Sequence, residues 1–152
     1  MSQPTRAKEA PWTRREVLGA GAGVVSLTVI GCAAKLPPAR EVTPEAGEVT
    51  LRLADAQEEL SRPGGAITLE VAGVKKPILL VRGEGDTYRA ILLKCTHLGC
   101  TVGYDEAAGA LACPCHGSRF DISGAVTHGP AKAPLTTFPV TVDGEALRFR
   151  PS

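Results

Sequence analysis

Two short segments rich in cysteine and histidine constrain this chain more than any other feature. The first is CTHLGC at residues 95–100, and the second is CPCHGS at residues 113–118. The stretch between them is long enough for a strand, a turn and a returning strand. Since the two ends of a hairpin meet, we expect both segments to lie at the same end of the fold and to form one site.

Thiolate and imidazole ligands together suit zinc or iron. Each segment offers one cysteine and one histidine as ligands, and this leaves one cysteine in each segment for a disulfide that ties the two segments together. The ligand pairs are Cys95 with His97 and Cys113 with His116, and the remaining cysteines are Cys100 and Cys115. A zinc site needs only four ligands and gives no reason for the second cysteine pair. Zinc fingers also keep their cysteines together and their histidines together, whereas here they are interleaved.

The paired segments resemble the cluster-binding boxes of Rieske iron–sulfur proteins, over about residues 66–150. In that family two cysteines hold one iron of a [2Fe–2S] cluster and two histidines hold the other. The resemblance implies that Cys95 and Cys113 bind the inner iron. It implies that His97 and His116 bind the outer, more exposed iron and that His116 contacts quinol, with His97 nearby. Cys100 and Cys115 match a disulfide that soluble, cytoplasmic Rieske ferredoxins lack.

Further positions match residues that tune the cluster in this family. Gly129 and Pro130 match the proline loop that covers the cluster from a third side, and Leu98 is expected to shield the cluster and to shape an apolar docking surface. Ser118 matches a hydroxyl that hydrogen-bonds a bridging sulfide and so raises the reduction potential. Phe120 stands where high-potential members have a tyrosine, so we expect a potential below the top of the Rieske range.

The third histidine, His128, is interpreted as a solvated turn residue and is left out of the ligand set. The two segments already fill four ligand positions without it.

The rest of the chain predicts an all-β fold, an antiparallel sandwich of the Rieske type. Short strands are expected at residues 67–71, 77–81 and 88–93, and a hairpin at 139–149 turns at Asp143-Gly144. One short helix is expected at 54–60, before Arg62-Pro63-Gly64.

The first 34 residues have the layout of an export signal, with a basic region, an apolar region and then small residues. Arg14-Arg15 resembles a twin-arginine signal in which Val17 replaces the usual Phe. The segment ending at Cys32 resembles a lipobox, so acylation of Cys32, an uncleaved membrane anchor and ordinary cleavage after Ala34 all remain alternatives. The first two would leave the protein tethered at the outer face of the bacterial cytoplasmic membrane. Residues 35–48 are expected to be a Pro-containing linker, and residues 49–152 the folded domain.

The charge balance excludes a nucleic-acid-binding role, because the formal net charge is only +1 and aromatic residues make up 4% of the chain. A disulfide agrees with export, since the cytosol reduces such bonds. A twin-arginine route also fits, since a protein must fold around its cluster before it leaves the cytoplasm.

The expected function is one-electron transfer as the iron–sulfur subunit of a quinol–cytochrome c reductase-like chain, with quinol as donor and a c-type cytochrome as acceptor. The alternatives are an electron-transfer subunit of another periplasmic oxidoreductase, of the arsenite oxidase type, and a stand-alone lipoprotein redox carrier or sensor. A Rieske oxygenase does not fit, since it needs a second domain with a mononuclear iron. A structural zinc module remains as the remote alternative outside electron transfer.

Overall fold

The computed structural model describes residues 35–151. The expected export signal and Cys32 lie outside the described residues. Within residues 35–151, no helix is long and apolar enough to cross a membrane.

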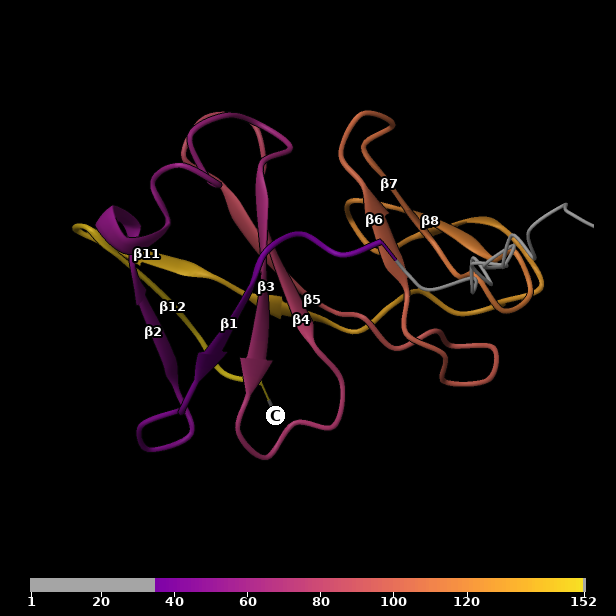
Figure 1. The fold of residues 1–152 in the computed structure, drawn as a ribbon, viewed down its shortest axis with the longest axis horizontal. Coiled ribbons are helices and arrows are strands. Elements are labelled where there is room, and N and C mark those ends of the chain that lie inside the picture. Colours follow the sequence, from indigo (N-terminus) through magenta and orange to yellow (C-terminus); the bar gives the residue numbers. More distant parts are fainter. Residues whose placement is uncertain (1–34, 152) are drawn as a thin grey trace, which may run out of the picture. The chain divides into compact units, whose positions relative to one another are not determined.

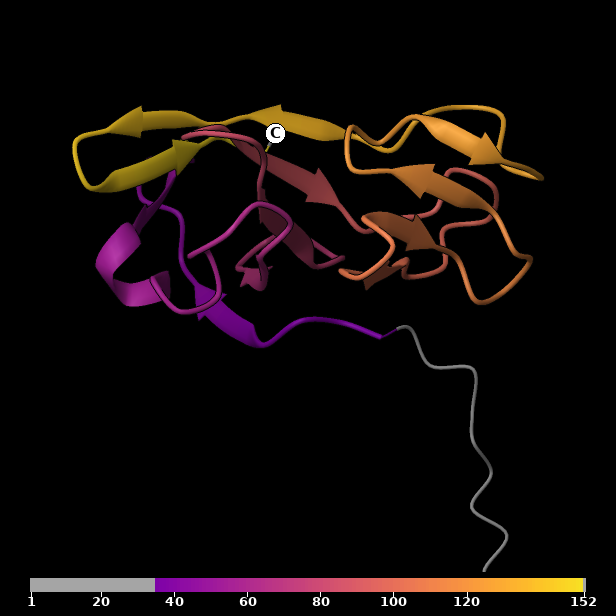
Figure 2. The same cartoon turned by 90° about the horizontal axis from the view of Figure 1, so that it is seen from above.

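The described chain is all-β, as the sequence predicted, and its strands form three sheets (Figure 1). A five-stranded sheet has the order β1-β3-β4-β5-β10, a three-stranded sheet the order β11-β12-β2, and a four-stranded sheet the order β6-β7-β8-β9. Two views show the five-stranded sheet between the other two (Figures 1 and 2). The strands are β1 (Ala39–Val42), β2 (Val49–Arg52), β3 (Ala66–Val71), β4 (Ile78–Arg82), β5 (Tyr88–Leu92), β6 (Gly103–Asp105), β7 (Ala110–Ala112), β8 (Arg119–Asp121), β9 (Val126–His128), β10 (Thr137–Pro139), β11 (Thr141–Asp143) and β12 (Ala146–Phe149).

The sequence of strand β4 is a continuous apolar run because both faces of the strand are buried. Its alternate side chains enter two different cores, Ile78 and Leu80 on one side and Leu79 and Val81 on the other. Because successive side chains of a strand point to opposite faces, a strand covered on both faces shows no polar alternation. The second of these cores continues under the cysteine segments, so β4 supports the site from below.

Residues 35–48 were expected to be a linker outside the folded domain, but part of this segment is a strand of the five-stranded sheet. Strand β1 lies within it and pairs in parallel with β3. The contact extends upstream, where the Thr68 hydroxyl donates to the Pro37 carbonyl over 3.1 Å. Parallel pairing of distant segments leaves no local turn signal in the sequence, so the prolines alone suggested a free connection.

The expected helix at 54–60 is also shorter than predicted. A 3-10 helix, η1 (Leu53–Ala56), is followed by turns. Only one helical bond extends it, from the Leu60 amide to the Ala56 carbonyl over 2.9 Å. No side chain caps the beginning of this helix, and a segment so short gains little from helix formation without caps.

Tyr104 on β6 joins the four-stranded sheet to the rest of the fold. Its hydroxyl donates to the Gly64 carbonyl over 2.7 Å, and its amide donates to the Lys35 carbonyl over 2.9 Å. Burial raises the pKa of Tyr104, with smaller contributions from the carboxylates of Glu106 and Asp105. Tyr104 therefore fills the core and also forms a polar link to Gly64.

Candidate metal centre

The two cysteine segments fold into matched loops. In the first loop the Cys95 amide donates to the Cys100 carbonyl over 2.9 Å, and the Gly99 amide donates to the Cys95 carbonyl over 2.8 Å. The second loop repeats this pattern: the Cys113 amide donates to the Ser118 carbonyl over 2.8 Å, and the Gly117 amide to the Cys113 carbonyl over 3.0 Å. The two loops are thus closed at the same spacing, four and five residues after the first cysteine.

The glycine in each loop is required by the backbone. Gly99 has φ of 76° and Gly117 has φ of 77°, both in the left-handed region that side chains with a Cβ rarely adopt. Each glycine turns the chain back towards its first cysteine. The motif spacing therefore encodes loop geometry as well as ligand identity.

The first cysteines of the two loops lie together in the interior. Cys95 and Cys113 are each 2% exposed, and both are free thiols. Burial raises the pKa of Cys113, and a hydrogen bond with the Cys95 thiol raises it further. Two adjacent thiols that are kept from water suit one half of the predicted metal site, and metal binding would release their protons.

The histidines of the two loops lie together at the surface. Both are exposed, and the ring centroids of His97 and His116 are 4.9 Å apart with the planes at 87°. The loops therefore bring all four predicted ligands to one end of the fold, with the sulfur ligands inside and the nitrogen ligands outside.

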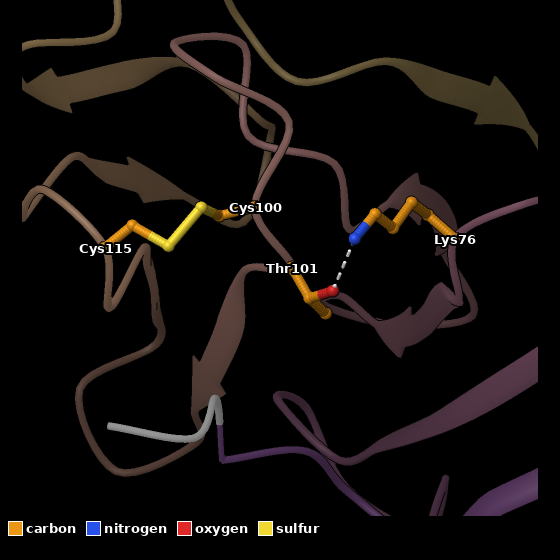
Figure 3. The surroundings of a disulfide bond; sticks show 4 residues. All are labelled: Lys76, Cys100, Thr101 and Cys115. Atoms are coloured by element: carbon orange, nitrogen blue, oxygen red, sulfur yellow. Dashed lines mark hydrogen bonds between the residues drawn. A yellow bond between two sulfur atoms is a disulfide. The ribbon is translucent and has the colours of Figure 1, made fainter. Parts of the chain in front are cut away.

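The other two cysteines form the expected disulfide, Cys100–Cys115, with 6.6 Å between their Cα atoms (Figure 3). The Cys113 sulfur lies within 4.8 Å of both disulfide sulfurs. Since oxidised sulfurs do not act as thiolate ligands, these three do not make a separate metal site. The disulfide instead fixes one ligand loop against the other.

A third segment contacts both ligand loops through hydroxyl groups. The buried Ser118 hydroxyl accepts a bond from the Ala131 amide over 3.0 Å, beside the exposed Gly129 and Pro130. The Thr96 hydroxyl donates to the Ala133 carbonyl over 2.6 Å. Because Ser118 accepts from Ala131, its own proton stays free to be donated elsewhere. Thr96 was missed from the sequence, although a hydroxyl between two ligands is a signal that could have been used.

Two apolar residues complete the site. Leu98 directly follows His97 in the first loop and is 68% exposed, as a docking side chain would be. Phe120 on β8 is fully buried and packs in the core beneath the loops. No phenolic hydroxyl exists at this position to bond a ligand sulfur.

His128 lies on β9 opposite Arg119 and is exposed. The expected exposure is therefore present, but the expected turn is wrong because His128 ends a strand, and it belongs to neither ligand loop.

These donors fit a Rieske [2Fe–2S] cluster. The cluster needs two thiolates on one iron and two imidazoles on the other. Cys95 and Cys113 provide adjacent thiols, while His97 and His116 provide adjacent rings on the outer side. The different depths of the two pairs match the different exposure of the two irons.

Comparison with known proteins agrees with this chemistry. The Rieske [2Fe-2S] domain family matches residues 51–139, more than half of the chain. The cytochrome b6-f complex iron-sulfur subunit 2 of Nostoc sp. (strain PCC 7120) is 30% identical over 91% of this chain and 85% of its own length. The cytochrome b6-f complex iron-sulfur subunit of Prochlorococcus marinus (strain MIT 9515) is 44% identical, but the match spans 45% of this chain and only 39% of that protein.

Solved structures share the fold. The plasma membrane Rieske protein of Synechocystis PCC 6803 superposes with a TM-score of 0.56 at 31% identity, covering 67% of this chain and 98% of that one. The ferredoxin of carbazole 1,9a-dioxygenase from Nocardioides aromaticivorans gives 0.51 at 28% identity, covering 69% and 98%. The cofactor of this chain is a Rieske-type [2Fe–2S] cluster, which transfers single electrons. With two cysteines inside, two histidines outside and more than half of its length matched, this chain belongs to the Rieske [2Fe–2S] iron–sulfur proteins.

Proposed function

We propose that this protein is the electron-transfer subunit of a quinol-oxidising membrane complex. Its cluster is bound by Cys95, His97, Cys113 and His116. The observation that carries the proposal is the exposure of both imidazoles at one end of the fold, 4.9 Å apart. The relationship to a cytochrome b6-f iron-sulfur subunit over most of both chains supports the same role.

The residues divide the work between the interior and the surface. When bound, the cluster supplies a one-electron acceptor at the edge of the protein. Cys95 and Cys113 exclude water from its inner side, since both are buried. His116 is the contact for quinol and His97 lies beside it, and each exposed ring has one nitrogen free to hold a proton. The site thus takes an electron and a proton from the same donor.

The surroundings of the cluster set its potential in opposite directions. The Ser118 hydroxyl accepts from the Ala131 amide, so its proton would be free to bond a sulfide of the bound cluster and would raise the potential. Phe120 offers no hydroxyl to bond a ligand sulfur, and the absence of that bond would lower the potential. The balance suits a chain with a lower-potential donor, for example menaquinol.

The proposed setting is the outer face of the bacterial cytoplasmic membrane. A twin-arginine signal around Arg14-Arg15 exports the folded protein, and the segment at 17–34 or an acyl group on Cys32 tethers it. A c-type cytochrome on the same side accepts the electron.

A redox titration of the full chain carrying its cluster, repeated across pH, tests the quinol role. We expect a positive potential that falls as pH rises, because reduction favours protonation of the ligand imidazoles. The matched variant Phe120→Tyr should raise the potential and keep the pH dependence. A low potential that stays flat across neutral pH would contradict the proposal and favour a simple relay subunit of another periplasmic oxidoreductase, such as the arsenite oxidase type.

A further inference from the structure

Three lysines surround one hollow beside the first ligand loop. Lys75 and Lys76 lie in the connection between β3 and β4, and Lys94 follows β5. The hollow has a volume of about 330 Å³ and also has the apolar side chains of Val74, Leu92 and Phe138 in its walls. We call it the lysine hollow.

The charge of the lysine hollow is not balanced from within the fold. No aspartate or glutamate lines it, and none of the three lysines forms an ion pair within residues 35–151. By contrast, the hollow lined by Arg82 also contains Asp86 and Glu145. Residues 49–152 carry 11 basic and 11 acidic side chains, so the positive charge here is a local concentration.

The lysine hollow borders the metal centre. Lys94 directly precedes Cys95, and its side-chain carbon Cε lies 3.7 Å from the place that a Cβ on Gly99 would take. The Lys76 ammonium donates to the Thr101 hydroxyl over 3.0 Å, next to Cys100 of the disulfide (Figure 3). A molecule seated in the lysine hollow would therefore lie near the Cys100 end of the first ligand loop.

We propose that the lysine hollow docks an acidic surface of a redox partner protein. This inference rests on the proposed function, because it gives that function a docking site. Three ammonium groups that form no ion pair within residues 35–151 attract carboxylates and increase the rate of encounter. The apolar walls provide a contact that can be desolvated inside a charged rim, as in protein interfaces. Electron transfer needs a partner near the cluster, and Lys94 and Lys76 place the hollow beside the first ligand loop.

A protein fits the lysine hollow better than a lipid surface. A membrane is an extended anionic plane that attracts basic residues spread over a whole face. Here the three lysines are confined to one concave site with apolar walls. Carboxylate side chains on a convex partner surface can enter such a site.

The test measures binding of an acidic c-type cytochrome to the full chain carrying its cluster, with both proteins oxidised. The variant is Lys75→Glu and the matched control is Arg52→Glu, which makes the same charge change at an exposed position of β2. We expect Lys75→Glu to weaken binding about tenfold at low salt. The control should change it less than about twofold, and high salt should remove the difference.

Four results would overturn the proposal. The docking site is contradicted if the wild-type protein does not bind the acidic cytochrome. It is also contradicted if Lys75→Glu leaves that binding unchanged. Equal weakening by both variants shows that net charge alone acts. Vesicles of an anionic phospholipid form the second probe: loss of vesicle binding in Lys75→Glu with unchanged cytochrome binding assigns the hollow to lipid instead.

The docking site and the quinol role can fail separately. Binding between oxidised proteins needs no quinol chemistry, and Lys75 is remote in sequence from every ligand. If the protein binds the cytochrome but its potential does not depend on pH, the quinol role is contradicted and the docking site is supported. If cytochrome binding is absent but the potential falls as pH rises, the docking site is contradicted and the quinol role is supported.

Discussion

The strands of the five-stranded sheet and the ligand loops hold their shape by different means. Strands β3, β4 and β5 are five or six residues long and mostly buried. Strands β6 to β9, which bear the loops, have three residues each. The loops are joined by a disulfide and by hydroxyl contacts from Thr96 and Ser118. Apolar burial is therefore enough for the large sheet, whereas the site depends on a few specific bonds and on its metal.

The largest effect is expected from removing one ligand. His116→Ala should abolish the visible absorbance of the cluster, because one iron loses half of its protein ligands. Far-ultraviolet circular dichroism should still show the strands of the large sheet. His128→Ala is the matched control and should keep the cluster. A bleached His128→Ala protein would show that the ligand set is wrong.

The large sheet should respond most to loss of apolar volume. Leu80 is fully buried on β4, so Leu80→Ala should lower the free energy of unfolding by about 2–5 kcal/mol. Leu98→Ala removes the same atoms from a side chain that is 68% exposed and should change stability by less than about 0.5 kcal/mol. Chemical denaturation of both variants measures the contrast. Similar losses would mean that Leu98 is packed like a core residue.

The contact between the second ligand loop and the proline segment should give an intermediate effect. Ser118→Ala leaves the Ala131 amide without its partner and should cost about 1–3 kcal/mol. The potential should also fall, because a hydroxyl donor near the cluster is lost. Ser61→Ala, at an exposed serine of the turns after η1, should leave the potential unchanged. An unchanged potential in Ser118→Ala would remove the tuning role.

The smallest effect concerns the turn between β8 and β9. The Ser123 hydroxyl and the Ser123 and Ala125 amides donate to the Asp121 carboxylate, and these bonds lower the pKa of Asp121, the hydroxyl most strongly. A pKa lowered by folding adds stability above the ordinary value of the group, and this stability is lost as pH falls through the folded pKa.

Unfolding measured between pH 5 and pH 3 tests this contribution, since the pKa of an unperturbed aspartate is about 3.9. Wild-type protein should lose slightly more stability on acidification than Asp121→Asn. Asp55→Asn, at an exposed residue of η1, should behave as wild type. Identical acid profiles of wild type and Asp121→Asn would contradict the assignment.

The sequence by itself determined the ligand chemistry and the local elements. Thiol and imidazole groups in two short loops define the cluster because each loop closes on itself within six residues. The C-terminal hairpin and the apolar run at 77–81 were predictable because turn conformation and burial leave local patterns. The turn itself is at Gly144-Glu145, one residue later than predicted, because Asp143 pairs with Ala146 as the last residue of β11.

Only the tertiary structure decided contacts between segments far apart in the chain. Strand β1 joins β3 across more than 20 residues, and the Ala131 amide meets the Ser118 hydroxyl across 13. The lysine hollow combines the β3–β4 connection with residues that follow β5. Such contacts depend on how the sheets pack, and a pattern in neighbouring residues carries no record of a partner that folding brings from elsewhere.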